Sequence, residues 1–235
     1  MQKSMHAAVV EAFKKPLVLR EMPVPEVGRN QEGERVGVPW LYSACGHCEY
    51  RLSAWETVCP EAQFGGYTRN GSFAEYILAD PDYVAHIPKG LTPQAAAPII
   101  CAGVTTYKGI KQTGARAGDW IAISGIGGLG HLAIQYSKIM GFQIVAIDIA
   151  YDKLALAKHL DADVTVNAKN GDLVAERITI RGSFVGTRQD IAEALAFAAD
   201  GRELVPLAGR VVLDFAKDPP ASKSVSAKQR VPVAG

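Results

Sequence analysis

The sequence lacks the features that would place it in a membrane or on nucleic acid. No apolar run approaches the length that a transmembrane helix needs. The segment Met1–Val10 has no long apolar core, so we do not expect a signal peptide. The formal net charge is only +1, without the basic field of a general nucleic-acid binder. We therefore expect a cytoplasmic protein that binds neither a membrane nor nucleic acid.

Cysteine is scarce, and its distribution is uneven. The chain has four cysteines, and without a secretion signal a disulfide framework is not expected. Three of them, Cys45, Cys48 and Cys59, lie close together in the sequence, whereas Cys101 is alone. The cluster favours a metal site. As an isolated thiol, Cys101 is expected to be buried and inert.

The first part of the chain, residues 1–105, is predicted to form short strands around an irregular lobe. The lobe, residues 43–71, is rich in cysteine, glycine and polar residues and has no sustained periodicity. A small, apolar stretch at Pro93–Val104 is expected to be helical and to continue to Thr113. Strands are expected at Ala7–Val10, Leu17–Arg20, Arg35–Val38 and Phe73–Leu78.

The second part, residues 106–199, alternates between strand and helix patterns, which predicts an α/β domain with a parallel sheet. Residues 200–215 are expected to form a return strand to the first domain. Residues 216–235 have little to bury and are predicted to be a disordered tail. We expect strands at Trp120–Ser124 (buried), Gln143–Asp148, Val164–Val166, Arg177–Val185 and Arg210–Phe215, and helices at Leu129–Met140, Asp152–Leu160 and Gln189–Ala199.

A glycine-rich loop lies between the first of these strands and the helix that follows it. The loop reads Gly125-Ile126-Gly127-Gly128-Leu129-Gly130. The first glycine permits a tight turn out of the strand, Gly127 lets a pyrophosphate approach the backbone, and Gly130 allows close packing. The N-terminus of the helix supplies N–H groups and partial positive charge for phosphates. The loop is therefore predicted to bind a dinucleotide.

An acidic residue, Asp148, ends the second strand at the distance expected for such a site. Its carboxylate can accept hydrogen bonds from both hydroxyls of the adenosine ribose, and it would repel a 2′-phosphate. We therefore expect NAD rather than NADP. Lys153, five residues further on, is expected to reach the same ribose.

The cysteine cluster has the spacing Cys45-x2-Cys48-x2-Arg51-x7-Cys59, which is one ligand short of a four-cysteine zinc lobe. Arg51 stands at the third position, where a cationic guanidinium cannot bind zinc. Two interpretations stay open: three thiolates that hold zinc with a water or Glu49, or three free thiols. The ring of His47 is expected to point away from both neighbouring cysteines.

The chain resembles the zinc-dependent medium-chain alcohol dehydrogenases, and the bacterial NAD-dependent, ethanol-active type in particular. The resemblance covers nearly all of Met5–Phe215 in pieces. It is carried by four stretches: Gly37-Val-Pro-Trp-Leu-Tyr-Ser-Ala-Cys-Gly-His-Cys-Glu-Tyr50, Ala97-Pro-Ile-Ile-Cys-Ala-Gly-Val-Thr-Thr-Tyr-Lys-Gly109, Ile123-Ser-Gly-Ile-Gly-Gly-Leu-Gly-His131 and Gly182-Ser-Phe-Val-Gly-Thr-Arg188.

The resemblance implies a mostly β, GroES-like catalytic domain and a Rossmann domain, with the active site in the cleft between them. It also implies the cofactors NAD and zinc, a small primary alcohol or aldehyde as substrate, and a homo-oligomer. The implied roles are a catalytic-zinc ligand for Cys101, structural-zinc positions for Cys45, Cys48 and Cys59, and contact with the nicotinamide side for Thr105. For NAD they are the glycine loop (Gly125, Gly127, Gly128, Leu129, Gly130), Asp148 and Lys153, and Arg210 at the pyrophosphate.

The chain departs from the family where the family has its other catalytic-zinc ligands. The sequence passes from Gly28 almost directly to Gly33, without the Cys-x-x-His and Gly-His-Glu segments of the family. Further stretches are missing between Asn167 and Asp172 and between Gly201 and Arg210. Zinc activates the alcohol as a Lewis acid through three protein ligands and one open position. We therefore expect impaired or absent activity, and the alternative function is an inactive NAD-binding or subunit-interaction protein of this family.

Overall fold

The computed structural model describes residues 3–12, 14–26, 34–170 and 183–200. Its strands are β1 (Ser4–Val9), β2 (Val18–Pro23), β3 (Val36–Gly37), β4 (Leu41–Ser43), β5 (Gln63–Phe64), β6 (Ala85–His86), β7 (Trp120–Ser124), β8 (Gln143–Asp148) and β9 (Val164–Asn167). Its α-helices are α1 (Glu49–Leu52), α2 (Pro93–Pro98), α3 (Val104–Thr113), α4 (Gly130–Ile139), α5 (Tyr151–His159) and α6 (Arg188–Ala199). None of the helices among these residues is long and apolar enough to cross a bilayer.

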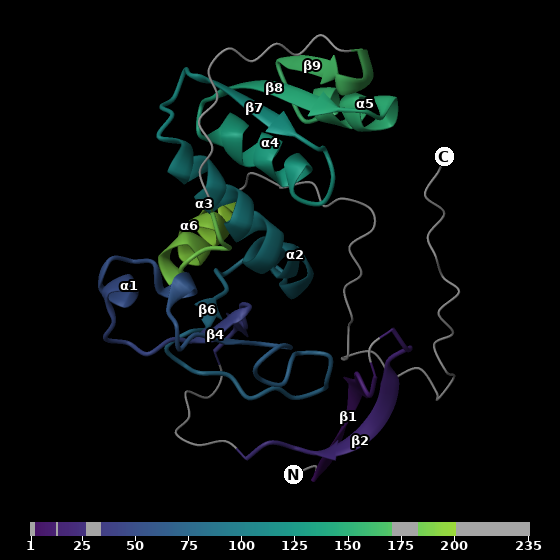
Figure 1. Cartoon of the computed structure of the whole chain (residues 1–235), viewed down its shortest axis with the longest axis vertical. Helices are drawn as coiled ribbons and strands as arrows, with labels where there is room; N and C mark the ends of the chain where they lie inside the picture. The colour runs from purple at the N-terminus through teal and green to yellow at the C-terminus, as the bar shows by residue number, and fades with distance from the viewer. Residues whose placement is uncertain (1–2, 13, 27–33, 171–182, 201–235) are drawn as a thin grey trace.

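A parallel sheet of order β7-β8-β9 forms one end of the molecule (Figure 1). Helix α4 packs against β7 and β8, and α5 packs against β8 and β9. The apolar side chains of this layer, among them Ile126, Ile134 and Ile144, are fully buried. The predicted alternation of strands and helices is confirmed here. The apolar residues of each element recur at the spacing that places them on one face, and that face packs against the neighbouring sheet or helix.

The prediction that Trp120–Ser124 is a buried strand is wrong. Trp120 is 54% exposed, and exposure alternates along β7. The reason is that α4 packs against β7 on one face, and within the described residues no other helix packs closely against this strand, which lies at the edge of the sheet. An apolar run of this kind is typical of a strand whose two faces are both covered.

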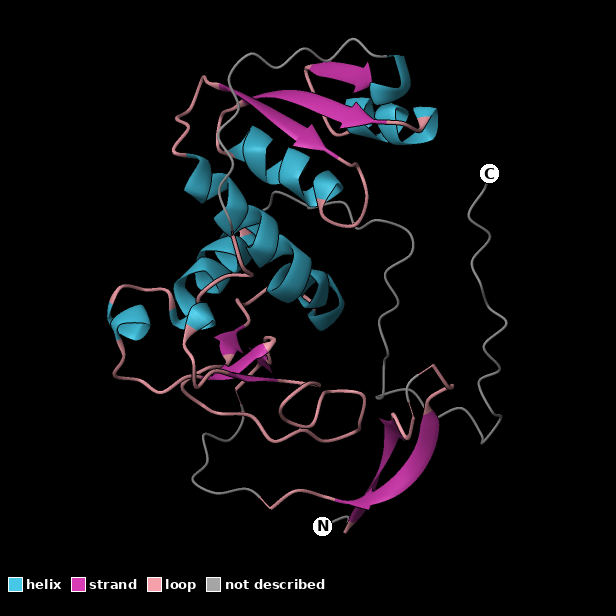
Figure 2. Cartoon of the chain, in the orientation of Figure 1, coloured by secondary structure: helices cyan, strands magenta, loops and turns pink. Residues whose placement is uncertain are grey.

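The centre of the molecule is helical (Figure 2), where α3, α4 and α6 surround a core that contains Tyr107 and Tyr136. Helix α2 begins at Thr92, whose hydroxyl accepts the N–H of Ala95, and it is followed by a π-helical turn, Ile99–Gly103. Pro98 has no N–H to continue the regular ladder, which accounts for the change of helix type. The predicted helix at 93–113 is thus confirmed, with an irregular turn inside it.

The remaining strands are short and separate. β1 and β2 form an antiparallel hairpin as predicted, and β3 pairs with β6, and β4 with β5. The strand predicted at Phe73–Leu78 is wrong, since only one bridge forms there, between Ala7 and Ala74. The pairing of this segment with β1 does not continue, because the N–H of His6 donates to the Glu75 carboxylate at 2.7 Å.

Three predicted segments lie partly or wholly outside the described residues. These are the return strand at 200–215, which contains Arg210–Phe215, the tail at 216–235, and most of the strand predicted at Arg177–Val185. The three described residues of that last range, 183–185, form no strand. The domain boundaries at 105 and 199 stay predictions.

Candidate functional site

The glycine loop leaves the carboxyl end of β7 and enters α4, as predicted. Gly125 has a φ of +84°, a conformation that only glycine adopts without strain, and its N–H donates to the Ile147 carbonyl of β8 at 2.8 Å. A Cβ on Gly130 would lie 1.9 Å from the Gly125 carbonyl oxygen. Both glycines are therefore required by the turn itself.

The outer side of the loop is open. A Cβ on Gly127 or Gly128 would meet no atom within 4 Å, so the backbone here faces free space. Within the described part of the chain, the N–H groups of residues 127–130 donate to no acceptor. These groups and the start of α4 provide hydrogen-bond donors and partial positive charge for an anion. Phosphates fit this cradle.

The carboxylate of Asp148 is bound to the loop. One oxygen accepts the N–H of Ile126 at 2.7 Å, and the other accepts those of Ile149 and Ala150 at 2.7 and 3.0 Å. Burial alone would raise the pKa of Asp148, but these three N–H groups outweigh it, with help from the charge of Lys153, and hold the pKa below its ordinary value. Asp148 is thus a fixed anion beside the phosphate cradle.

The other predicted NAD contacts differ in what the structure shows. Lys153, on α5, has its ammonium 3.9 Å from the Asp152 carboxylate and close enough to Asp148 to affect it. Thr105 lies in the first turn of α3, and its hydroxyl donates to the Cys101 carbonyl at 2.7 Å. Arg210 lies outside the described residues. Contact of each with the cofactor stays a prediction.

Three of the cysteines come together, as the sequence predicted. The sulfur atoms of Cys45, Cys48 and Cys59 all lie within 4.8 Å of one another. The backbone N–H of His47 at the sulfur lowers the pKa of Cys45 to about 7 against the opposing effect of burial. The ring of His47 lies near Cys45, in a second group with Glu61, so the prediction that it points away is wrong. Its Nδ1 lies 2.9 Å from the Cys45 carbonyl oxygen, which turns the ring toward that residue.

The residue at the fourth ligand position of the cysteine lobe, Arg51, is not a metal ligand. The guanidinium of Arg51 contacts the Glu56 carboxylate instead, with Nε and Oε2 3.7 Å apart. Glu49, the alternative ligand considered from the sequence, belongs to no group of three ligand atoms among the described residues.

Cys101 is exposed, so the expectation of a buried thiol is wrong. The π-helical turn explains this, because it puts Ala102 and Gly103 into the core and Cys101 on the surface. In the described ranges, no other possible ligand pair joins Cys101. The histidines His6 and His86 pair with Glu75 and Glu34. The described residues do not fit a catalytic zinc site.

Comparison with known proteins identifies the family. The family model described as "Alcohol dehydrogenase GroES-like domain" matches residues 9–89, and "Zinc-binding dehydrogenase" matches residues 128–178. An alcohol dehydrogenase of Rhizobium meliloti (strain 1021) is 38% identical, over 85% of this chain and 89% of the relative. One of Moraxella sp. (strain TAE123) is 45% identical, over 73% of this chain and 67% of the relative.

The chain belongs to the zinc-dependent medium-chain alcohol dehydrogenase family. Its fold agrees: acetophenone reductase from Geotrichum candidum in complex with NAD has a TM-score of 0.75 at 18% identity, covering 88% of this chain and 90% of that one. The alcohol dehydrogenase of the archaeon Aeropyrum pernix has a TM-score of 0.70 at 20% identity, covering 84% and 90%. The predicted truncated Rossmann domain with a GroES-like domain is confirmed.

The comparison with a relative in this alcohol dehydrogenase family also confirms that internal segments are missing from the chain. The comparison with the Rhizobium protein runs over 304 positions, whereas 85% of this 235-residue chain is about 200 residues. About 100 positions of that comparison therefore face gaps in this chain. The family segments described above as missing from the sequence are gaps of this kind.

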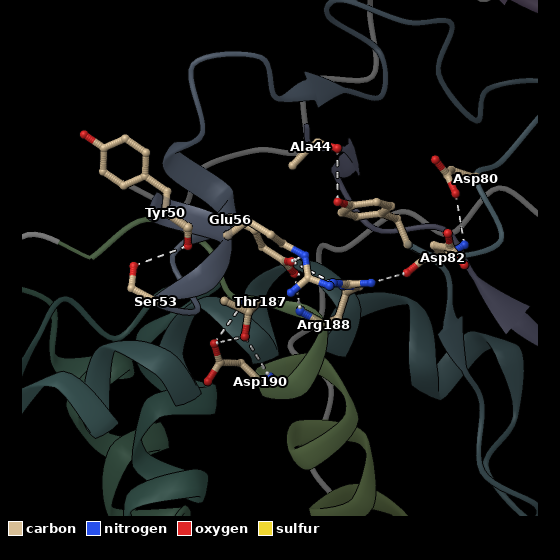
Figure 3. Close-up of polar contacts among 11 residues, drawn as sticks. Ala44, Tyr50, Ser53, Glu56, Asp80, Asp82, Thr187, Arg188 and Asp190 are labelled. Atoms are coloured by element: carbon tan, nitrogen blue, oxygen red, sulfur yellow. Dashed lines mark hydrogen bonds and ion pairs between the residues drawn. The ribbon is translucent and has the colours of Figure 1, made fainter. Parts of the chain in front are cut away.

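A charged cluster that the sequence did not predict joins the cysteine lobe to the start of α6 (Figure 3). Glu56, whose side chain is 5% exposed, accepts from Nε and Nη2 of Arg188 at 3.1 and 2.9 Å. Arg188 also donates to the Asp82 carbonyl at 2.7 Å and lies over the ring of Tyr83. Glu56 and Arg188 are 132 positions apart, so no local pattern signals their contact.

The start of α6 did carry a sequence signal. Thr187 and Asp190 form a reciprocal capping box, in which the Thr187 hydroxyl and the Asp190 carboxylate satisfy each other's backbone N–H. A threonine followed three residues later by an acidic side chain is a known start signal for a helix. This cap fixes the backbone on which Arg188 is placed.

Proposed function

We propose that this chain binds NAD through the adenosine half of its Rossmann domain and does not oxidise alcohols. The observation that carries the proposal is the open cradle at Gly127 and Gly128 beside the fixed anion of Asp148. Pyrophosphate would accept from the free N–H groups of the loop and the start of α4. Asp148 would accept from the ribose hydroxyls and repel a 2′-phosphate.

The cofactors of the family support the proposal in different degrees. NAD supplies a hydride acceptor when bound, and the open glycine loop and the Asp148 carboxylate support binding of its phosphate and adenosine groups. A catalytic zinc would polarise an alcohol oxygen, but only Cys101 of its ligand positions remains. Thr105 and Cys101 lie on one helical segment, at the positions that the family uses for its reaction, and in this proposal they no longer support it.

A second candidate function is an active, NAD-dependent oxidation of a small primary alcohol to an aldehyde. Membership in the alcohol dehydrogenase family and identities of 38% and 45% to enzymes of that name favour it. It requires two further metal ligands beside Cys101, and the described residues bring none to it. The formation of a homo-oligomer stays a prediction.

A pair of glycine substitutions tests the proposed NAD site. At Gly127, which has no neighbour within 4 Å of a new Cβ, alanine leaves folding intact but places a methyl group in the phosphate cradle. Gly127→Ala should weaken NADH binding at least about tenfold, the effect of about 1.4 kcal/mol. Titration followed by NADH fluorescence measures the affinity, and thermal unfolding checks the fold.

Gly109→Ala is the matched control. Gly109 lies in α3, and a Cβ there would also meet nothing within 4 Å. Alanine in a helix should stabilise the chain by about 0.5–1 kcal/mol and leave NADH affinity unchanged. Equal affinities in Gly127→Ala and in the original chain would sink the proposed site.

A further inference from the structure

The three clustered cysteines form a half-open shell around their common centre. Cys45 and Cys48 come from the turn that precedes α1, and Cys48 is the residue at which α1 begins. Cys59 follows the short 3-10 helix Glu56–Val58 and is 5% exposed, whereas Cys45 and Cys48 are partly exposed. The site therefore has a buried floor and an open outer side.

The geometry of the three sulfur atoms suits a metal ion. They all lie within 4.8 Å of one another, and the N–H of Cys48 donates to the sulfur of Cys45 at 3.3 Å. The charged thiolate is the form of cysteine that binds a metal, and three thiolates fit a soft divalent cation.

The fourth side of a tetrahedron is left open by the protein. Arg51, at the family's fourth ligand position, turns its guanidinium to Glu56 and can never act as a ligand. Glu56 also accepts two hydrogen bonds from Arg188, so it offsets the positive charge of Arg51 only in part. His47 and Glu61 approach Cys45 from its exposed side but form no group with Cys48 and Cys59.

We propose that Cys45, Cys48 and Cys59 form an open three-thiolate metal site whose fourth coordination position takes an exchangeable ligand from solution. Structural zinc sites have four protein ligands, whereas three protein ligands and a solvent position are the arrangement of reactive zinc. The ligand class is a small thiol, a water molecule or an anion. This proposal does not depend on the NAD site, which lies on other elements.

Cobalt(II), which can replace zinc and whose visible spectrum reports its coordination, is the probe for this site. The original chain should bind one cobalt ion and give a tetrahedral spectrum. Addition of 2-mercaptoethanol should shift that spectrum toward four-sulfur coordination. A spectrum that does not respond to the added thiol, or no cobalt binding at all, would overturn the proposal.

The variant Arg51→Cys closes the site and gives the reference state. Its cobalt spectrum should match that of the original chain with added thiol and should not change further when thiol is added. Loss of an outer-shell partner alone costs about 10–100-fold in metal affinity, so a new direct ligand should tighten zinc binding by at least about tenfold. Equal zinc affinities in the two proteins would contradict an open position.

Three further variants separate the site from its surroundings. Cys59→Ser should abolish the cobalt spectrum, and Cys101→Ser, which changes the exposed cysteine outside the cluster, should leave it intact. His47→Ala should keep both the spectrum and its response to thiol. If His47→Ala alone creates the thiol response, His47 is the fourth ligand and the site is closed, contrary to the proposal.

Discussion

At the scale of single residues, Asp148 links the cofactor site to the stability of the fold. Its carboxylate accepts three backbone N–H groups, from the loop after β7 and the loop after β8. Hydrogen bonds to a charged group contribute about 1.5–3 kcal/mol each when they are removed singly. The same side chain thus shapes the loop and presents negative charge to a ribose.

Substitution of Asp148 by asparagine should weaken both functions. The amide keeps one acceptor oxygen and loses the charge, so at least one N–H group of the loop is left without its partner. NADH affinity should fall about 10–100-fold, which corresponds to about 1.5–3 kcal/mol. Fluorescence titration measures it. Asp152→Asn is the control, because Asp152 is exposed and its described ion pair is with Lys153 at 3.9 Å; a similar loss there would contradict the assigned role of Asp148.

At the scale of elements, the Glu56–Arg188 pair attaches the cysteine lobe to α6. The two side chains are 5% and 29% exposed, so the pair is mostly shielded from solvent. Removal of one partner of a buried pair costs about 3–5 kcal/mol because a charge is left without its counterion. Arg188 keeps some access to water, which places the expected cost at the lower end.

A double-mutant cycle tests this attachment. Glu56→Gln and Arg188→Met should each destabilise the chain by about 3 kcal/mol, and the double variant by less than the sum. Urea unfolding measures the free energies. The exposed pair Arg20–Glu11 is the comparison, for which removal should cost about 0–1 kcal/mol. Additive effects of Glu56→Gln and Arg188→Met would show that the two side chains do not interact.

Tyr107 makes the helical core sensitive to alkaline pH. Burial, and then its hydrogen bond to Glu193, raise the pKa of Tyr107 to about 12. Because this pKa lies above the ordinary value of 10.0, the stabilising contribution is complete below pH 10 and is lost as the pH rises toward 12. Burial lowers the pKa of Lys111, but its hydrogen bonds to Glu193 and Asp190 outweigh burial and hold the pKa above its ordinary value.

The slope of stability against alkaline pH should therefore be shallower in Tyr107→Phe. Urea midpoints between pH 9 and 11 measure the slope in the variant and in the original chain. Tyr67→Phe, at an 81% exposed position, should leave the slope unchanged. An unchanged slope in Tyr107→Phe would show that this tyrosine does not titrate against folding.

For the whole molecule, the parts that the sequence predicts are those with local causes. The path from β7 through the glycine loop to Asp148 follows from periodicity and from the backbone needs of Gly125 and Gly130. The exposed face of β7 at Trp120 and the contact of Glu56 with Arg188 were not predictable, because each depends on which distant segments pack against the residue. The exposure of Cys101 depends on the π-helical turn after Pro98, which the helical spacing of residues 93–113 did not predict.

We infer that the chain as a whole keeps the family's cofactor cradle and has lost its catalytic metal site. The most direct test combines zinc analysis, NADH titration and an ethanol assay on one purified sample. We expect one NADH per chain, no more than one zinc ion per chain, and no NADH formed from NAD⁺ and ethanol. Two zinc ions per chain together with NADH formation would contradict it.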